Sequence, residues 1–136
     1  MKLYYYWLHK DEKERIKRRD GNKCLRCGST KHLTVDHIIP KSILTKTKKH
    51  VGYIGNNYQT LCQPCNLIKG INIGTYREDK LAEYAINSFI TRIEEKEDVI
   101  KNLNTNYMVS VFAAIRRYGK KEKKPELKIE HIIYMV

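Results

Sequence analysis

The chain has 136 residues, which suits one domain with a small appendage. Its 27 Lys and Arg outnumber 15 Asp and Glu, and the net charge of +12 favours a polyanionic partner such as nucleic acid, although charge alone leaves a soluble basic protein equally open. No apolar stretch approaches the ~20 residues that a membrane span needs. The apolar run at the N-terminus is too short for a signal peptide, so we expect a cytoplasmic protein.

Residues 1–22 are predicted to form an N-terminal extension. Its aromatic run, Tyr4–Trp7, suits either a strand or an anchoring tail. The charged segment Lys10–Arg19 predicts a short helix that Gly21 ends. The dense charges of this helix indicate a solvated surface or, alternatively, a surface that faces phosphates.

Two cysteine pairs with C-x-x-C spacing follow, and they are Cys24 with Cys27 and Cys62 with Cys65. Two thiolates on one tight turn can bind one metal ion, and two such turns complete a tetrahedral zinc site. A disulfide framework is the rival interpretation, but the spacing and the lack of secretion signals favour zinc. A site of four thiolates has no open position for a substrate, so the predicted zinc is structural.

The region between the two pairs predicts a strand and a loop. Residues 33–35 alternate between apolar and polar, which predicts a short strand that runs into Asp36 and His37. Pro40 ends regular strand pairing. Residues 41–56 are predicted to be a loop, because they hold two glycines and a lysine-rich run that is either a disordered insertion or a DNA-contacting loop.

The second cysteine pair lies at the junction of a predicted strand and helix. The strand is expected at Gln59–Cys62, and the helix is expected from Pro64 to Lys69 with Gly70 at its end. Proline early in the helix is acceptable, because the first N–H groups of a helix have no internal partners.

Residues 75–136 predict a mostly helical C-terminal region. The capping-box pattern from Thr75 to Glu78 is expected to open a first helix, whose apolar residues recur every four positions from Leu81 to Ile93.

Beyond this helix the chain predicts two further elements. A helix is expected at Tyr107–Tyr118. A charged link at 120–125 follows, and alternation through Leu127, Ile129 and His131 predicts a terminal strand.

Several strings within residues 24–70 carry a family resemblance. They read C-L-R-C-G, L-T-V-D-H-I-I-P and N-Y-Q-T-L-C-Q-P-C-N-L-I-K-G. In this order they closely resemble the HNH nucleases of the ββα-metal, or His-Me finger, group. The resemblance implies an α+β fold, in which a small ββα-metal core at 23–74 is stapled by the four-cysteine zinc site and followed by a helical region at 75–136.

The chain departs from the family pattern in two places. The third family letter, often histidine, is Asn66, as in other members that include phage recombination and homing nucleases. The glycine-rich loop that often follows the proline is replaced by Lys41, Ser42 and Ile43 with a lysine-rich stretch, which affects substrate contacts rather than chemistry.

The resemblance implies a role for each of four residues. His37 is expected to be the general base, Asp36 and Asn66 the oxygen ligands of a catalytic Mg²⁺ or Mn²⁺, and Asn57 the residue that holds the loop so that His37 faces its water. Phosphodiester hydrolysis needs a proton acceptor and a cation that stabilises developing charge. Histidine titrates near neutrality and can accept that proton.

Each assignment has a plainer alternative. Asp36 and His37 could form a surface pair, Asn66 could cap a helix, and Asn57 could be a turn residue. Lys69 suits a phosphate contact and a helix C-terminus equally. The remaining histidines are expected at the surface, and they are His9, His32, His50 and His131.

Two classes of function follow. The favoured one is a metal-dependent DNA endonuclease, with double-stranded DNA as substrate, in a bacterial or phage-infected cell. The alternative is a non-catalytic, zinc-stapled module that binds nucleic acid, and RNA is a weaker third substrate. The sequence does not separate phage DNA processing, homing and restriction. It also leaves the oligomeric state open, although two subunits would let one site per chain cut both strands.

Overall fold

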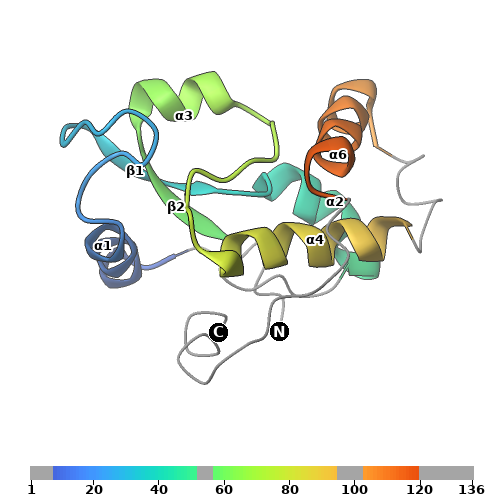
Figure 1. Ribbon diagram of the computed structural model, residues 1–136, viewed down its shortest axis with the longest axis horizontal. Helices are drawn as coiled ribbons and strands as arrows, with labels where there is room; N and C mark the ends of the chain where they lie inside the picture. The colour runs from blue at the N-terminus through green and yellow to red at the C-terminus, as the bar shows by residue number, and fades with distance from the viewer. Residues whose placement is uncertain (1–7, 52–56, 95–102, 120–136) are drawn as a thin grey trace.

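The protein has an α+β fold, and the computed structural model describes residues 8–51, 57–94 and 103–119 (Figure 1). Within these ranges it contains one two-stranded antiparallel sheet and five helices. In chain order the elements are α1 (Lys10–Arg19), β1 (Leu33–His37), α2 (Lys41–Val51), β2 (Tyr58–Cys62), α3 (Gln63–Lys69), α4 (Lys80–Glu94) and α6 (Thr105–Tyr118). The predicted fold class is confirmed. The aromatic run at 4–7, the charged link at 120–125 and the predicted terminal strand lie outside the described residues.

The two strands pair antiparallel, from Leu33 opposite Cys62 to His37 opposite Tyr58. Directly opposed residues share a face of a hairpin, and successive residues alternate between faces. Asp36 therefore lies on the face opposite to that of His37. Both predicted strands are confirmed, and β2 begins one residue earlier than expected. In the view of Figure 1 the hairpin runs between α3 and α1.

Helices α1 and α3 follow the sequence prediction closely. α1 occupies the predicted residues, and Gly21 beyond it has a φ of +80°, a conformation that glycine adopts without steric cost. Ile16 is the buried residue of α1, so most of this helix is solvated. α3 begins directly after β2, with Cys62 as its N-cap, and Gly70 ends it.

Residues 41–51 form helix α2, so the predicted loop over 41–56 is wrong for this part of the chain. Ile43, Leu44 and Thr47 are all fully buried, and their spacing places them on one face of a helix. The carbonyl of Pro40 accepts hydrogen bonds from the N–H groups of Ile43 and Leu44, at 3.0 and 3.1 Å, which starts the first turn. The high lysine content of this segment made its short apolar face difficult to recognise in the sequence. Residues 52–56 lie outside the described residues.

Helix α4 begins at Lys80, so the capping box predicted at Thr75 is wrong. The Thr75 Oγ1 instead accepts a hydrogen bond from the Arg77 N–H at 3.0 Å, which stabilises a local turn. The cap is Asp79, whose Oδ1 accepts from the Ala82 N–H at 3.0 Å. Two cap patterns compete in this segment, and the one closer to the apolar periodicity is used.

The main hydrophobic core lies between α2, α4 and α6. Phe89, Ile86 and Ile93 of α4 are fully buried, as their periodicity predicted. Ile38 and Ile39, the two residues directly after β1, belong to the same buried cluster. The C-terminal helices therefore fix the position of the chain that follows His37.

Phe89→Ala should destabilise the protein by about 3–5 kcal/mol, because it removes a fully buried aromatic ring and leaves a cavity. Phe112 is 41% exposed, so Phe112→Ala is the matched control and should change stability by less than about 0.5 kcal/mol. Urea unfolding of both variants measures the difference, and equal midpoints would contradict this description of the core.

Candidate functional site

The four cysteines form one cluster. Their sulfur atoms all lie within 4.8 Å of one another, and Sγ of Cys27 lies 3.6 Å from Sγ of Cys62. A tetrahedral zinc ion with Zn–S bonds of ~2.3 Å separates its sulfurs by ~3.8 Å. Disulfide sulfurs are only ~2.05 Å apart, and all four cysteines are free thiols. The predicted four-cysteine metal site is therefore confirmed as a set of ligands positioned for one ion.

Local backbone bonds hold the first cysteine pair on its turn. The Cys24 N–H donates to the Ser29 carbonyl at 2.8 Å, and the Gly28 N–H donates to the Cys24 carbonyl at 2.9 Å. Gly28 has a φ of +83°, which closes this turn. The Leu25 N–H donates to the Thr60 carbonyl at 3.0 Å and so attaches the turn to the edge of β2.

The surroundings of Cys24 and Cys65 favour negative charge on their sulfur atoms. Burial raises the pKa of the Cys24 thiol, but hydrogen bonds from the backbone of Cys62, Cys27 and Arg26 lower it to about 6. The Arg26 guanidinium donates to Sγ of Cys65 at 3.4 Å. A thiolate is the form that binds a metal, so these contacts support metal binding.

Asp36 is buried, with 7% of its surface exposed, and it has a nearby positive charge. Nζ of Lys69 lies 3.2 Å from its Oδ2, and Nε2 of Gln59 donates to the same oxygen at 2.9 Å. Burial raises the pKa of the Asp36 carboxyl, while Lys69 and Gln59 oppose this shift. Asp36 is therefore not part of the surface pair that was the plainer alternative.

Lys69 is 4% exposed, and its ammonium group also donates to the His37 carbonyl at 2.9 Å. From the sequence, a phosphate contact and stabilisation of a helix C-terminus were equally suitable roles for this residue. The structure gives it a different role, because its charge balances a buried carboxylate and its bond to the His37 carbonyl fixes the end of β1.

The imidazole of His37 lies on the other face of β1. Its ring packs edge-on against Tyr58, with ring centroids 5.0 Å apart. Burial, with the positive charges of Lys41 and Lys69, lowers the pKa of His37 to about 4. Its Nε2 is buried and has no hydrogen-bond partner in the described part of the chain. At neutral pH this side chain is an uncharged imidazole.

Asn57 is 2% exposed and bonds to the chain just beyond His37. Its Oδ1 accepts from the Ile39 N–H at 2.8 Å, and its Nδ2 donates to the Ile39 carbonyl at 2.9 Å. Its own carbonyl accepts from the Ile38 N–H at 3.0 Å. These three bonds fasten the start of β2 to the two residues that follow His37.

Asn66 lies inside α3 and does not cap it, since Cys62 is the N-cap. Its Nδ2 donates to Oγ1 of Thr34 at 3.0 Å. Residues three apart lie on the same side of a helix, so Asn66 and Lys69 face the hairpin together. Thr34 and Asp36, which they contact, share one face of β1. Helix α3 therefore presents Asn66 to the face that carries Asp36.

The other histidines lie away from this arrangement. His9 and His32 are exposed, as predicted. The side chain of His50 and all of His131 fall outside the described residues.

One partner of the site was missed in the sequence. Gln59 donates to both the Asp36 carboxylate and, at 3.1 Å, the Gly74 carbonyl. The strand register places Gln59 opposite Asp36. Pairing the two predicted strands in that register could have identified Gln59 from the sequence.

Comparison with known proteins found a family similarity. A family model described as HNH endonuclease matches residues 24–71. We refer to these residues as the HNH domain. No curated protein and no solved structure matches the chain. The HNH domain includes both cysteine pairs, the hairpin and α3, whereas α1 precedes it and α4 and α6 follow it.

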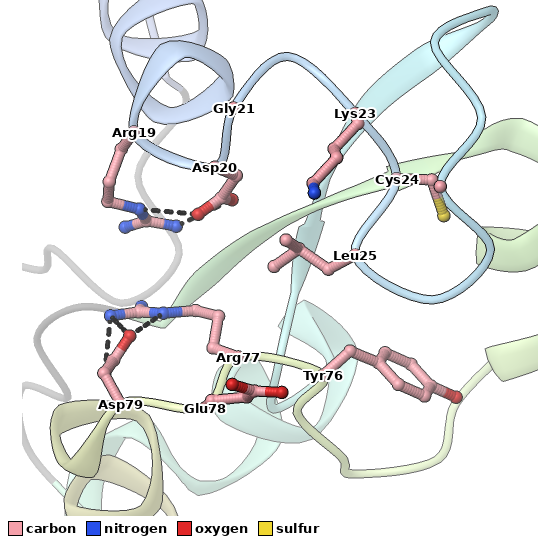
Figure 2. Close-up of a pocket in the computed structure, with 11 residues that line it drawn as sticks. Arg19, Asp20, Gly21, Lys23, Cys24, Leu25, Tyr76, Arg77, Glu78 and Asp79 are labelled. Carbon is pink, nitrogen blue, oxygen red and sulfur yellow. Dashed lines mark hydrogen bonds and ion pairs between the residues drawn. The ribbon is translucent and has the colours of Figure 1, made fainter.

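Two arginine–aspartate pairs lie on the segments that flank the HNH domain (Figure 2). The Arg19 and Arg77 guanidinium groups both donate to the Tyr58 carbonyl, at 2.8 and 3.2 Å. Arg19 also pairs with Asp20 at 2.9 Å, and Arg77 pairs with Asp79 at 2.7 Å. These residues line a cavity of about 530 Å³ in which each arginine has its own carboxylate. The hydrogen bonds to Tyr58 join α1 and the segment before α4 to the start of β2.

The matched family is described as an endonuclease, which is a class of enzymes that acts on nucleic acid. Among the described helices none has the length and apolar character required to span a bilayer.

Cys62→Ser should lose the bound metal and much of the stability of the HNH domain, because metal binding and folding are coupled in such sites. Gln63→Ser is the matched control, because it also introduces serine, but at the next position, which is exposed. Elemental analysis and thermal unfolding of the reduced proteins measure both effects. Folded, reduced parent protein without zinc would contradict the metal assignment.

Asn57→Ala should destabilise the protein by about 1–3 kcal/mol for each buried Ile39 backbone group that loses its partner. Asn106→Ala removes an amide from an exposed position and should have little effect. Chemical unfolding with metal present compares the two variants. Equal stability would show that the Asn57 bonds are not required to hold this segment.

Proposed function

We propose that the protein is a metal-dependent DNA endonuclease of the HNH type that hydrolyses phosphodiester bonds. One observation carries this proposal. Within a segment that matches the HNH endonuclease model, Asp36 and His37 stand at the end of β1, where Asp36 is buried and His37 is half-buried with its Nε2 covered, and specific contacts hold each of them. A buried carboxylate and a covered imidazole nitrogen without a hydrogen-bond partner are costly to maintain, which supports a role in chemistry.

His37 is proposed to act as the general base. Its imidazole is uncharged at neutral pH, so a ring nitrogen can accept a proton from the attacking water. Tyr58 supports the ring from one side, and Asn57 holds the chain directly after it. Asn57 is therefore proposed as a positioning residue for His37.

Asp36 and Asn66 are proposed to hold a Mg²⁺ or Mn²⁺ ion. A carboxylate and an amide oxygen are hard ligands of the kind these ions prefer, and α3 presents Asn66 to the face of β1 that carries Asp36. When bound, the ion would stabilise charge that develops on the phosphate and the leaving oxygen. Lys69 already lies against Asp36, so ion binding has to compete with an ammonium group and should be weak.

The four cysteines are proposed to hold structural zinc, and double-stranded DNA is the proposed substrate. The net charge of +12 supports binding to the DNA backbone. The alternative, a zinc-stapled binding module without catalysis, requires neither a buried carboxylate at Asp36 nor an unpaired imidazole nitrogen at His37. It would nevertheless use the same cysteine cluster and the same basic surface.

His37→Ala should reduce DNA cutting by ~10²–10⁴-fold, the usual contribution of a positioned general base. Zinc content and DNA binding should remain unchanged, because the cysteine cluster does not use this side chain. A plasmid-nicking time course under Mg²⁺ and Mn²⁺ titration measures the rate, and Asp36→Ala should also stop cutting by losing the ion.

The control for this experiment is His32→Asn. His32 is an exposed histidine with a φ of +54°, a conformation that asparagine accepts better than alanine. This variant should cut like the parent. Equal cutting by His37→Ala and the parent, or a parent that binds DNA without cutting under either ion, would favour the binding module.

A further inference from the structure

A second cavity, of about 340 Å³, lies where the end of the HNH domain meets α6. Its wall includes three cationic side chains, which are Arg26, Lys69 and Arg117. No carboxylate occurs among the described residues that line it. The three cations come from the first cysteine turn, from α3 and from α6.

The cavity of Figure 2 provides an internal comparison. There Arg19 and Arg77 are each paired with an aspartate, so their charges are satisfied within the protein. In the second cavity, Arg26 and Arg117 are exposed, and neither is paired with a carboxylate of a described residue. Arg26 contacts Sγ of Cys65, and the guanidinium carbon of Arg117 lies 5.5 Å from the ring centroid of Tyr118.

Some polar groups of this cavity already bond within the protein, and others can bond to a ligand. Ser110 is used, because its Oγ donates to the Ile71 carbonyl at 2.8 Å and accepts from the Ile73 N–H at 3.2 Å. The side-chain amide of Asn72 is exposed and makes no hydrogen bond to the described residues. The Arg117 guanidinium, the Asn72 amide and the N–H groups of Arg26 that do not face Cys65 are therefore available to an external acceptor.

We propose that this cavity binds a phosphate of the nucleic-acid backbone through Arg26 and Arg117, with Asn72 as an additional donor. Guanidinium groups bind phosphate oxygens through paired N–H donors, and a wall without carboxylates does not repel the anion. A water molecule takes up ~30 Å³, so the cavity has room for a phosphate with its sugar. The inference rests on the proposed function, because the ligand is part of the proposed substrate.

Lys69 connects this cavity to the proposed cleavage site. Its side chain lines the cavity, while its ammonium lies 3.2 Å from Oδ2 of Asp36. A strand held at Arg26 and Arg117 would therefore lie one side chain away from Asp36. Arg117 belongs to α6, beyond the residues that match the HNH model, so the C-terminal region would contribute directly to substrate binding.

The test measures binding of a labelled DNA duplex by fluorescence anisotropy, without added divalent ion so that no cutting occurs. Arg117→Ala should weaken binding by ~10-fold, in line with loss of a charge-assisted hydrogen bond. Its matched control is Arg116→Ala, which removes the same charge from the next, exposed position of α6 and does not line the cavity. The slope of log affinity against log salt concentration should also become shallower. The decrease should be larger by about 1 for Arg117→Ala than for its control.

A double-variant cycle tests whether the two arginines share one phosphate. Arg26→Ala with Arg117→Ala should lose less affinity than the product of the two single losses, because either change already disrupts the shared contact. Zinc content is measured for each protein, since Arg26 lies next to the cysteine cluster. If Arg26→Ala releases zinc, Arg26→Lys replaces it, and loss of affinity is still expected because lysine lacks the forked donor.

The outcomes separate this inference from the proposed function. If Arg117→Ala and Arg116→Ala bind with equal affinity and equal salt dependence, the phosphate site is wrong, while the nuclease proposal still depends on His37. If the parent protein does not bind DNA, both are overturned. Selective loss at Arg117 together with cutting by the parent supports both.

Discussion

The arrangement of the HNH domain depends on its four thiols. At the end of the hairpin where the cysteines lie, the buried cluster consists of Leu61 and three of the cysteines, with Leu33 packed against it. So little apolar surface cannot offset the entropy of ordering the first cysteine turn, the hairpin and α3. A metal ion shared by the four sulfurs would supply this free energy, because its binding is coupled to folding. The orientation of α3 over β1, and hence of Asn66 over Thr34, follows from that junction.

The opposite end of β1 is held by a different kind of interaction. Ile38 and Ile39 lie in the main hydrophobic core with α4 and α6, and Asn57 binds the backbone of Ile39. Asp36 and His37 therefore lie between a cysteine cluster on one side and an ordinary apolar core on the other. This arrangement gives the helices outside the HNH domain a structural role, since they support the segment that follows the proposed base.

Much of this organisation could be predicted from the sequence, and the failures have physical causes. The cysteine pairs and both strands depend on spacing within a few residues, so local patterns were sufficient. Helix α2 was missed because its apolar face is short and lies within a lysine-rich segment. The contacts of Asp36 with Gln59 and Lys69 depend on strand register and helix packing, which join residues far apart in the chain. The cationic cavity likewise becomes visible only when α6 is placed against the HNH domain.

The buried pair of Lys69 and Asp36 distinguishes the two metal sites that we propose. A bare carboxylate in this position would be costly, whereas an ammonium partner keeps it balanced in the absence of any ion. The proposed divalent ion would then bring a second cation to a carboxylate that already has one. Folding would not require the ion at this site, in contrast to the cysteine cluster. The metal at the cysteine cluster would be a permanent part of the fold, whereas the divalent ion at Asp36 would bind and dissociate reversibly.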